Sequence, residues 1–168
     1  MSRNTSIING TSLFCGIISA VCAFFARMLS GSPLDMVHKL EGIDILPPIW
    51  IFNLLSVAWY FLIGAAAGAV IHGVNKGCVR GKEEIWAYRG GIFFSVTFFS
   101  GLIWYPLFFV GEALFFSLVT SIIITLSAVL CAYFWFGAKI NNAALIMSAY
   151  TIWTFYVLIV NLSALFGI

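Results

Sequence analysis

The sequence predicts an all-α integral membrane protein, a bundle of five transmembrane helices. Three observations support this prediction: 62% of the 168 residues are hydrophobic, only 8% are charged, and long apolar stretches alternate with short polar connections. A soluble domain carries roughly 25% charged residues, and about 20 apolar residues suffice for a helix to cross a bilayer. A β-barrel is not expected, because the apolar runs are continuous and do not alternate.

The five expected helices fill a single domain, residues 1–168. They cover about residues 7–29, 48–74, 88–110, 113–136 and 142–168. The first is interpreted as a retained helix, because its apolar run is longer than the roughly 7–15 residues of a signal-peptide core. Pro47 and Pro48 precede the second helix, where a missing N–H is harmless.

Two polar connections are long enough to matter. The connection 75–87 is expected to be a solvated loop. Loop 30–46 mixes apolar and polar residues at helical spacing, which is compatible with a pocket lid and equally with a short helix on the lipid headgroups. Glu112 precedes the fourth helix, where a carboxylate suits the positive end of the helix dipole.

Basic residues indicate the orientation in the membrane. Five spans would put the N-terminus and the connections after the second and fourth helices on one side, and that side is the more basic. The positive-inside rule therefore predicts a cytoplasmic N-terminus. The two sides would carry Arg3, Lys76, Arg80, Lys82, Arg89 and Lys139 against Arg27 and Lys39.

Several function classes find no support in the sequence. The net charge of +2 and the absence of a basic run argue against nucleic-acid binding. The four cysteines form no CxxC or Cys/His cluster, so no metal site is expected. No catalytic set is visible, and the lack of carboxylates inside the spans argues against an ion-coupled pump. The bilayer itself is the expected partner.

The second helix combines aromatic and small residues. Phe52 and Trp59 are seven apart and share a face. Gly64 and Gly68 form a small-xxx-small patch, which lets another helix approach, from this chain or from a second subunit. Tryptophans of the interfacial belt lie at headgroup level. Trp86 fits that belt, and Trp50 and Trp135 are compatible with it, whereas Trp59, Trp104 and Trp153 lie deeper.

The last helix carries one polar–aromatic stripe, Tyr150, Trp153, Val157 and Asn161. Because an amide is costly against lipid, this stripe is expected to face the bundle interior. The third helix contains Pro106, which can bend a helix, among Trp104, Tyr105, Phe108 and Phe109. These aromatic residues could line a site for a flat ligand or simply pack the helices together.

Three segments together resemble one known family, the TspO/MBR family of tryptophan-rich sensory proteins and mitochondrial translocator proteins. LPPIWIF is similar to the family's PPxWxF at the start of its second helix, and WYFLIG continues it through Tyr60 and Gly64. IWYPLFF is similar to the third-helix signature WSPLFF. The fifth-helix signature is matched at Ala143, Ala144, Leu145, Tyr150, Trp153 and Asn161.

The chain departs from the family pattern at four places. Ser56 stands where a tryptophan is usual, Ile45 where a tryptophan precedes the prolines, Gly101 where an asparagine is usual, and Ala149 where a proline is usual. The sequence is therefore identified as a divergent member.

The resemblance implies a pocket under the connection between the first two helices, gated by loop 30–46. It implies a porphyrin, a haem-like tetrapyrrole or a sterol-like ligand, a homodimer, and a bacterial cell membrane as the location. Some bacterial members are associated with light-dependent porphyrin breakdown through a tryptophan pair, of which only Trp153 is present here.

The first hypothesis is therefore a membrane binding, transport or sensory protein for a planar hydrophobic ligand, with no required cofactor and no catalytic residue. The alternatives are a light-dependent porphyrin-degrading enzyme, and a regulatory or assembly subunit that uses Gly64 and Gly68 to hold a partner. The expected ligand-binding residues are Trp50, Phe52, Trp59, Trp104, Phe108, Tyr150 and Trp153, and the expected helix-packing residues are Gly64, Gly68, Pro106 and Asn161.

Overall fold

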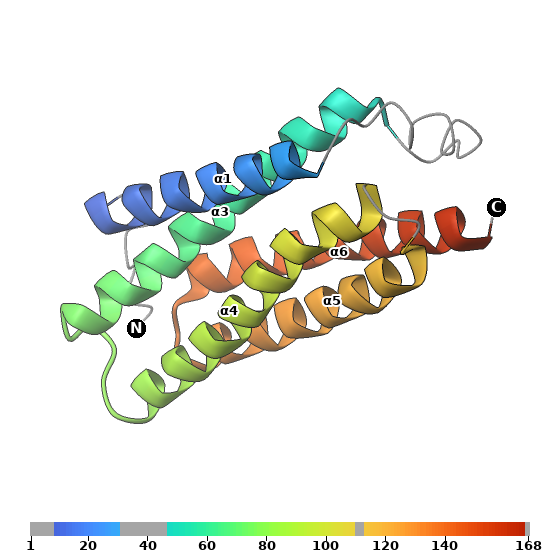
Figure 1. Ribbon diagram of the computed structural model, residues 1–168. Coiled ribbons are helices and arrows are strands. Elements are labelled where there is room, and N and C mark those ends of the chain that lie inside the picture. Colours follow the sequence, from blue (N-terminus) through green and yellow to red (C-terminus); the bar gives the residue numbers. More distant parts are fainter. Residues whose placement is uncertain (1–8, 31–46, 110–112, 167–168) are drawn as a thin grey trace.

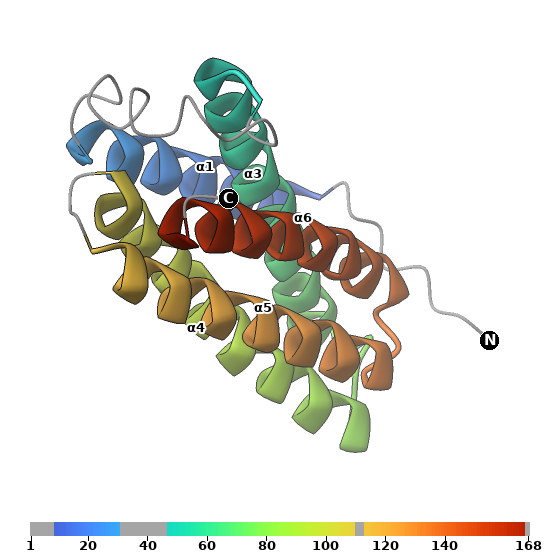
Figure 2. The same ribbon diagram turned by 90° about the vertical axis from the view of Figure 1, so that its right-hand side faces the viewer.

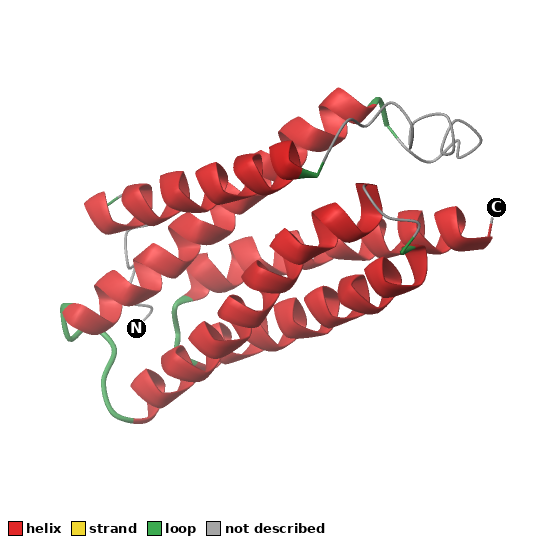
Figure 3. Ribbon diagram, in the orientation of Figure 1, coloured by secondary structure: helices red, strands yellow, loops and turns green. Residues whose placement is uncertain are grey.

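The computed structural model describes residues 9–30, 47–109 and 113–166. Within these ranges it has no strand and five helices that are long and apolar enough to cross a membrane (Figure 3). The predicted all-α, five-helix class is confirmed. The helices are α1 (Gly10–Leu29), α3 (Ile49–Asn75), α4 (Lys82–Phe109), α5 (Leu114–Gly137) and α6 (Asn141–Phe166). The predicted lid in loop 30–46 and the predicted helix cap at Glu112 lie outside the described residues, apart from Ser30, which caps α1.

The helices form two layers. Helices α1 and α3 pack side by side in one layer, and in the second layer α5 packs against both α4 and α6 (Figures 1 and 2). Contacts between the layers are fewer, and they join α3 to α6, α1 to α4 and α3 to α4. We call this boundary between the two layers the seam, and the helices are packed least tightly there.

Local signals explain most helix ends. The side chain of Asn9 accepts a hydrogen bond from the backbone N–H of Ser12 at 2.8 Å and caps α1. Pro48 caps α3 as expected, and its carbonyl oxygen accepts from the N–H of Ile51 at 2.8 Å. At the other end of α3, Gly77 takes a left-handed conformation with φ +64°, which glycine adopts without steric cost.

The expected loop 75–87 is wrong in its second half, because α4 begins at Lys82. Two acidic residues, Glu83 and Glu84, lie in its first turn, where negative charge is favoured by the helix dipole. Hydropathy missed this turn because it is polar and extends beyond the apolar part of the helix.

The glycines of α3 face α1 within the same chain. A Cβ added at Gly64 would lie 2.7 Å from the carbonyl oxygen of Cys15, and one added at Gly68 would lie 2.6 Å from the Cα of Ser12. Both glycines are buried. They allow two backbones to approach closely, as small residues do in membrane helices. The patch therefore packs against α1 of the same chain.

Two further expectations are corrected by burial. Trp135, which was compatible with the interfacial belt, is only 1% exposed and lies inside the bundle. Pro106, expected to pack helices, is on the exposed face of α4, and the helix continues past it to Phe109.

Candidate functional site

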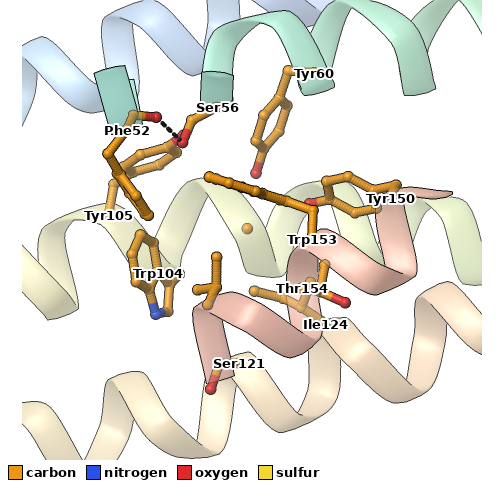
Figure 4. Close-up of a pocket in the computed structure, with 12 residues that line it drawn as sticks. Phe52, Ser56, Tyr60, Trp104, Tyr105, Ser121, Ile124, Tyr150, Trp153 and Thr154 are labelled. Carbon is orange, nitrogen blue, oxygen red and sulfur yellow. Dashed lines mark hydrogen bonds between the residues drawn. The ribbon is translucent and has the colours of Figure 1, made fainter. Parts of the chain in front are cut away.

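A small cavity lies in the seam between the two layers, between the first half of α3 and the last third of α4 (Figure 4). Helices α3, α4, α5 and α6 all contribute side chains to its wall. They are Phe52, Ser56, Tyr60, Gly101, Trp104, Tyr105, Ser121, Ile124, Tyr150, Trp153, Thr154 and Val157.

Phe52 joins the aromatic residues of three helices. It is 2% exposed, and its ring centroid lies 5.4 Å from Trp153 of α6 and 6.2 Å from Trp104 of α4. Neither pair is stacked face to face, and both centroid distances lie in the range that aromatic pairs favour. Ser56 and Tyr60 follow Phe52 at successive four-residue steps on α3, so all three side chains point at the cavity.

Trp104 is held from two sides. Its ring stacks on Phe108 with a centroid distance of 4.8 Å and an interplanar angle of 17°. Its indole N–H points to the amide oxygen of Asn161 at 3.4 Å. Phe108 is buried behind Trp104 and is not part of the cavity wall, so its contact with the cavity is made through Trp104.

Asn161 links three helices away from the cavity. Its amide oxygen also accepts a hydrogen bond from the Ser117 hydroxyl at 2.7 Å, and its amide nitrogen donates to the carbonyl oxygen of Val157 at 2.8 Å. The residue is fully buried. This geometry suits a structural role in joining α4, α5 and α6.

Tyrosine hydroxyls make the cavity partly polar. Tyr60, Tyr105 and Tyr150 line it together with Ser56, whose hydroxyl donates to the carbonyl oxygen of Phe52 at 2.8 Å. The Tyr60 hydroxyl occupies the space that a Cβ at Gly101 would need. The glycine that replaces the family's usual asparagine therefore makes room for a tyrosine from the facing helix.

Four of the expected ligand-binding residues line this one cavity: Phe52, Trp104, Tyr150 and Trp153. Trp59 and Phe108 contact lining residues but do not line the cavity themselves. The ring centroid of Trp59 is 5.9 Å from that of Tyr150. Trp50 is not part of the site, because it is 66% exposed on the outside of α3.

Other lining residues were not among the expected site residues. Ser56, Tyr60, Tyr105 and Thr154 all face the cavity. The four-residue spacing from Phe52 to Ser56 and Tyr60 was a usable signal in the sequence. No sequence signal marked Tyr105 and Thr154 as cavity residues. Each directly follows a tryptophan, and the direction of its side chain depends on how α4 or α6 is rotated.

A cation lies next to the aromatic cluster. The side chain of Arg27, in the last turn of α1, donates a hydrogen bond from Nε to the amide oxygen of Asn53 at 2.9 Å. Its guanidinium lies 4.2 Å from the ring centroid of Phe109, within the range of a cation–π interaction. Phe109 in turn contacts Phe52 at a centroid distance of 6.4 Å.

The cavity is small. Its ≈ 30 Å³ leaves room for about one or two water molecules. Sites for drug-sized ligands have about 300–1,000 Å³. The residues suit a planar apolar ligand in chemistry, but such a ligand would need the two layers to move apart. Across the described ranges, no group of three His, Cys, Asp or Glu side chains gathers in a way that could hold a metal ion.

Comparison with protein-family models matches the TspO/MBR family over residues 12–166. The match covers nearly the whole chain, so the protein belongs to the TspO/MBR family. No curated protein and no solved structure matches it.

Proposed function

We propose that this TspO/MBR protein binds a planar hydrophobic ligand, above all a porphyrin or haem-like tetrapyrrole, in the cavity between its two helix layers. Membership of the family makes the chain a membrane binding, transport or sensory protein. The observation that supports the ligand class is the meeting of Phe52, Trp104 and Trp153 from three different helices. Aromatic rings offer a flat ligand both apolar burial and stacking.

Trp153 marks the side from which a ligand would enter. It is half-buried, as are Trp59 and Tyr156 beside it on the α3–α6 side of the cavity. Contacts between α3 and α6 are few compared with those inside each layer. A ligand could separate these two helices without breaking the α1–α3 or α4–α5 pairs.

Arg27 would supply the polar recognition. Where water is partly excluded, a guanidinium binds carboxylates strongly through charge-assisted hydrogen bonds. Porphyrins of the protoporphyrin type carry two propionates and fit this arrangement, whereas a sterol would place only a hydroxyl there. This chemistry favours a tetrapyrrole over a sterol-like ligand.

The test is titration of the full-length protein in nanodiscs with protoporphyrin IX, followed by tryptophan quenching and by the porphyrin absorption band. Trp153→Phe keeps an aromatic ring but removes the indole. Trp50→Phe is the matched control, because Trp50 lies outside the cavity. We expect saturable binding, with the dissociation constant raised about threefold to tenfold in Trp153→Phe and unchanged in Trp50→Phe.

Two results would count against the proposal. Linear quenching without saturation would mean that the porphyrin only dissolves in the lipid. Equal dissociation constants for the wild type and Trp153→Phe would place the bound porphyrin elsewhere on the protein.

A further inference from the structure

A second cavity lies in the same seam at the opposite end of the bundle, where α3 ends and α4 begins. Its volume is ≈ 300 Å³. Its wall includes Ile71, Val74 and Asn75 of α3, Tyr88, Gly91 and Phe94 of α4, and Trp135 of α5. The cavity shares no residue with the aromatic site.

The cavity suits an apolar occupant. Val74 and Phe94 are typical of its wall, which is mostly aliphatic and aromatic. Its volume is about twice the ~150 Å³ of engineered apolar cavities that stay dry and bind benzene or xenon. Two lining residues, Ile71 and Tyr88, are 47% and 61% exposed on the outer surface of their helices. The cavity therefore opens towards the hydrocarbon of the bilayer.

One end of the cavity is polar and adjoins basic residues. Asn75 is both a lining residue and the last residue of α3, and Lys76 follows it. On α4, Arg89 follows the lining residue Tyr88, and Lys82 begins the helix. Lys76, Lys82 and Arg89 are all exposed. Basic pockets between membrane helices attract anionic lipid headgroups.

Acidic side chains at this end offset only part of the positive charge. Glu83 and Glu84 lie in the first turn of α4, and Glu83 forms an ion pair with Lys139 of the α5–α6 turn. Glu84 is then the one remaining acidic residue of this turn, against four exposed cations, Lys76, Arg80, Lys82 and Arg89. The balance favours a negatively charged ligand.

We propose that this cavity is a second binding site, which holds an acyl chain of an anionic membrane lipid while the basic residues beside it hold the headgroup. Trp135 forms its inner wall and is 1% exposed. Its indole N–H has no hydrogen-bond partner among the residues of known placement. That N–H lies against Gly90 of α4, beside the cavity wall.

The experiment uses the full chain in phosphatidylcholine nanodiscs that contain a small fraction of a lipid with a diazirine on its acyl chain. The probe is either phosphatidylglycerol or phosphatidylcholine, and crosslinked peptides are mapped after illumination. We expect phosphatidylglycerol to label residues 67–75 and 87–95 at least about fivefold more than phosphatidylcholine, from one or more basic contacts. Lys76→Gln together with Arg89→Gln should remove this preference.

Gly91→Leu tests the cavity itself. A Cβ at Gly91 meets no atom within 4 Å, so leucine can extend into the space without disturbing the helix. The matched control is Ala149→Leu, an exposed small residue of α6. Labelling by both lipids should fall in Gly91→Leu and stay unchanged in Ala149→Leu, with equal far-UV circular dichroism in both.

Two outcomes would overturn the proposal. Equal labelling by the two lipids would mean that the site has no preference for an anionic headgroup. Labelling that survives Gly91→Leu would show that the acyl chains lie on the outside of the helices and not in the cavity.

Discussion

The indole N–H of Trp104 and the side-chain oxygen of Asn161 lie 3.4 Å apart and join α4 to α6, while the Ser117 hydroxyl of α5 donates to the same oxygen at 2.7 Å. One amide oxygen therefore serves donors from two other helices. The same contact orients Trp104, whose ring forms part of the cavity wall. A packing residue and a site residue are coupled through this bond.

Asn161→Leu should destabilise the bundle, because it leaves the buried indole N–H of Trp104 without its acceptor and breaks the link to Ser117, whose hydroxyl keeps only the Leu114 carbonyl oxygen. The expected loss is about 1–3 kcal/mol, measured by unfolding in increasing sodium dodecyl sulphate. Ile159→Ala, on the exposed face of the same helix, is the control and should cost less. An unchanged midpoint for Asn161→Leu would mean that the amide does not hold the helices.

Gly64→Leu and Gly68→Leu should separate α1 from α3 within one chain, because a side chain at either position collides with α1 backbone atoms. We expect a loss of about 1–3 kcal/mol or more from overpacking, measured in the same unfolding assay. Ala58→Leu on the exposed face of α3 should be tolerated. A stable Gly64→Leu protein that lost only an oligomeric contact would support the partner-docking hypothesis.

Arg27→Gln should weaken the binding of protoporphyrin IX about tenfold, because the guanidinium would no longer attract a propionate. The dimethyl ester of the same porphyrin lacks the charges, so its affinity should not change. The measurement is the dissociation constant of each porphyrin in nanodiscs. Arg89→Gln, beside the other cavity, is the control. An equal loss for acid and ester would mean that Arg27 acts only through packing.

Ser56→Trp would restore the tryptophan usual in the family but should not fit the small site. Ser56 is 4% exposed and its hydroxyl donates to the carbonyl oxygen of Phe52 at 2.8 Å, and the adjoining cavity is only ≈ 30 Å³. We expect a loss of stability of about 1–3 kcal/mol. Ser56→Ala, which adds no volume, should lose less.

The same variant tests the enzyme hypothesis. Illumination of the porphyrin complex should give no product that depends on Trp153, in the wild type or in Ser56→Trp. A Trp153-dependent product, detected by chromatography, would favour light-dependent degradation in whichever protein produced it.

Much of the site could be read from helical spacing, and the failures share one cause. Tyr150 and Trp153 were predicted to face the bundle interior because Asn161, an amide that avoids lipid, indicated which face of α6 points inward, and both line the cavity. At the start of α3 the nearest amide, Asn53, accepts from Arg27 of α1, and Trp50 was assigned to the site although it faces outward.

Sequence alone therefore determined the class, the number of spans and the family, because a bilayer requires long apolar helices whatever their packing. It did not determine which faces of those helices meet. In lipid, both the interior and the exterior of a bundle are apolar, so hydrophobicity does not distinguish Trp135 inside from Trp50 outside. Only the tertiary structure decided that, through close contacts such as those of Gly64 and Gly68 with α1, which set how each helix is rotated.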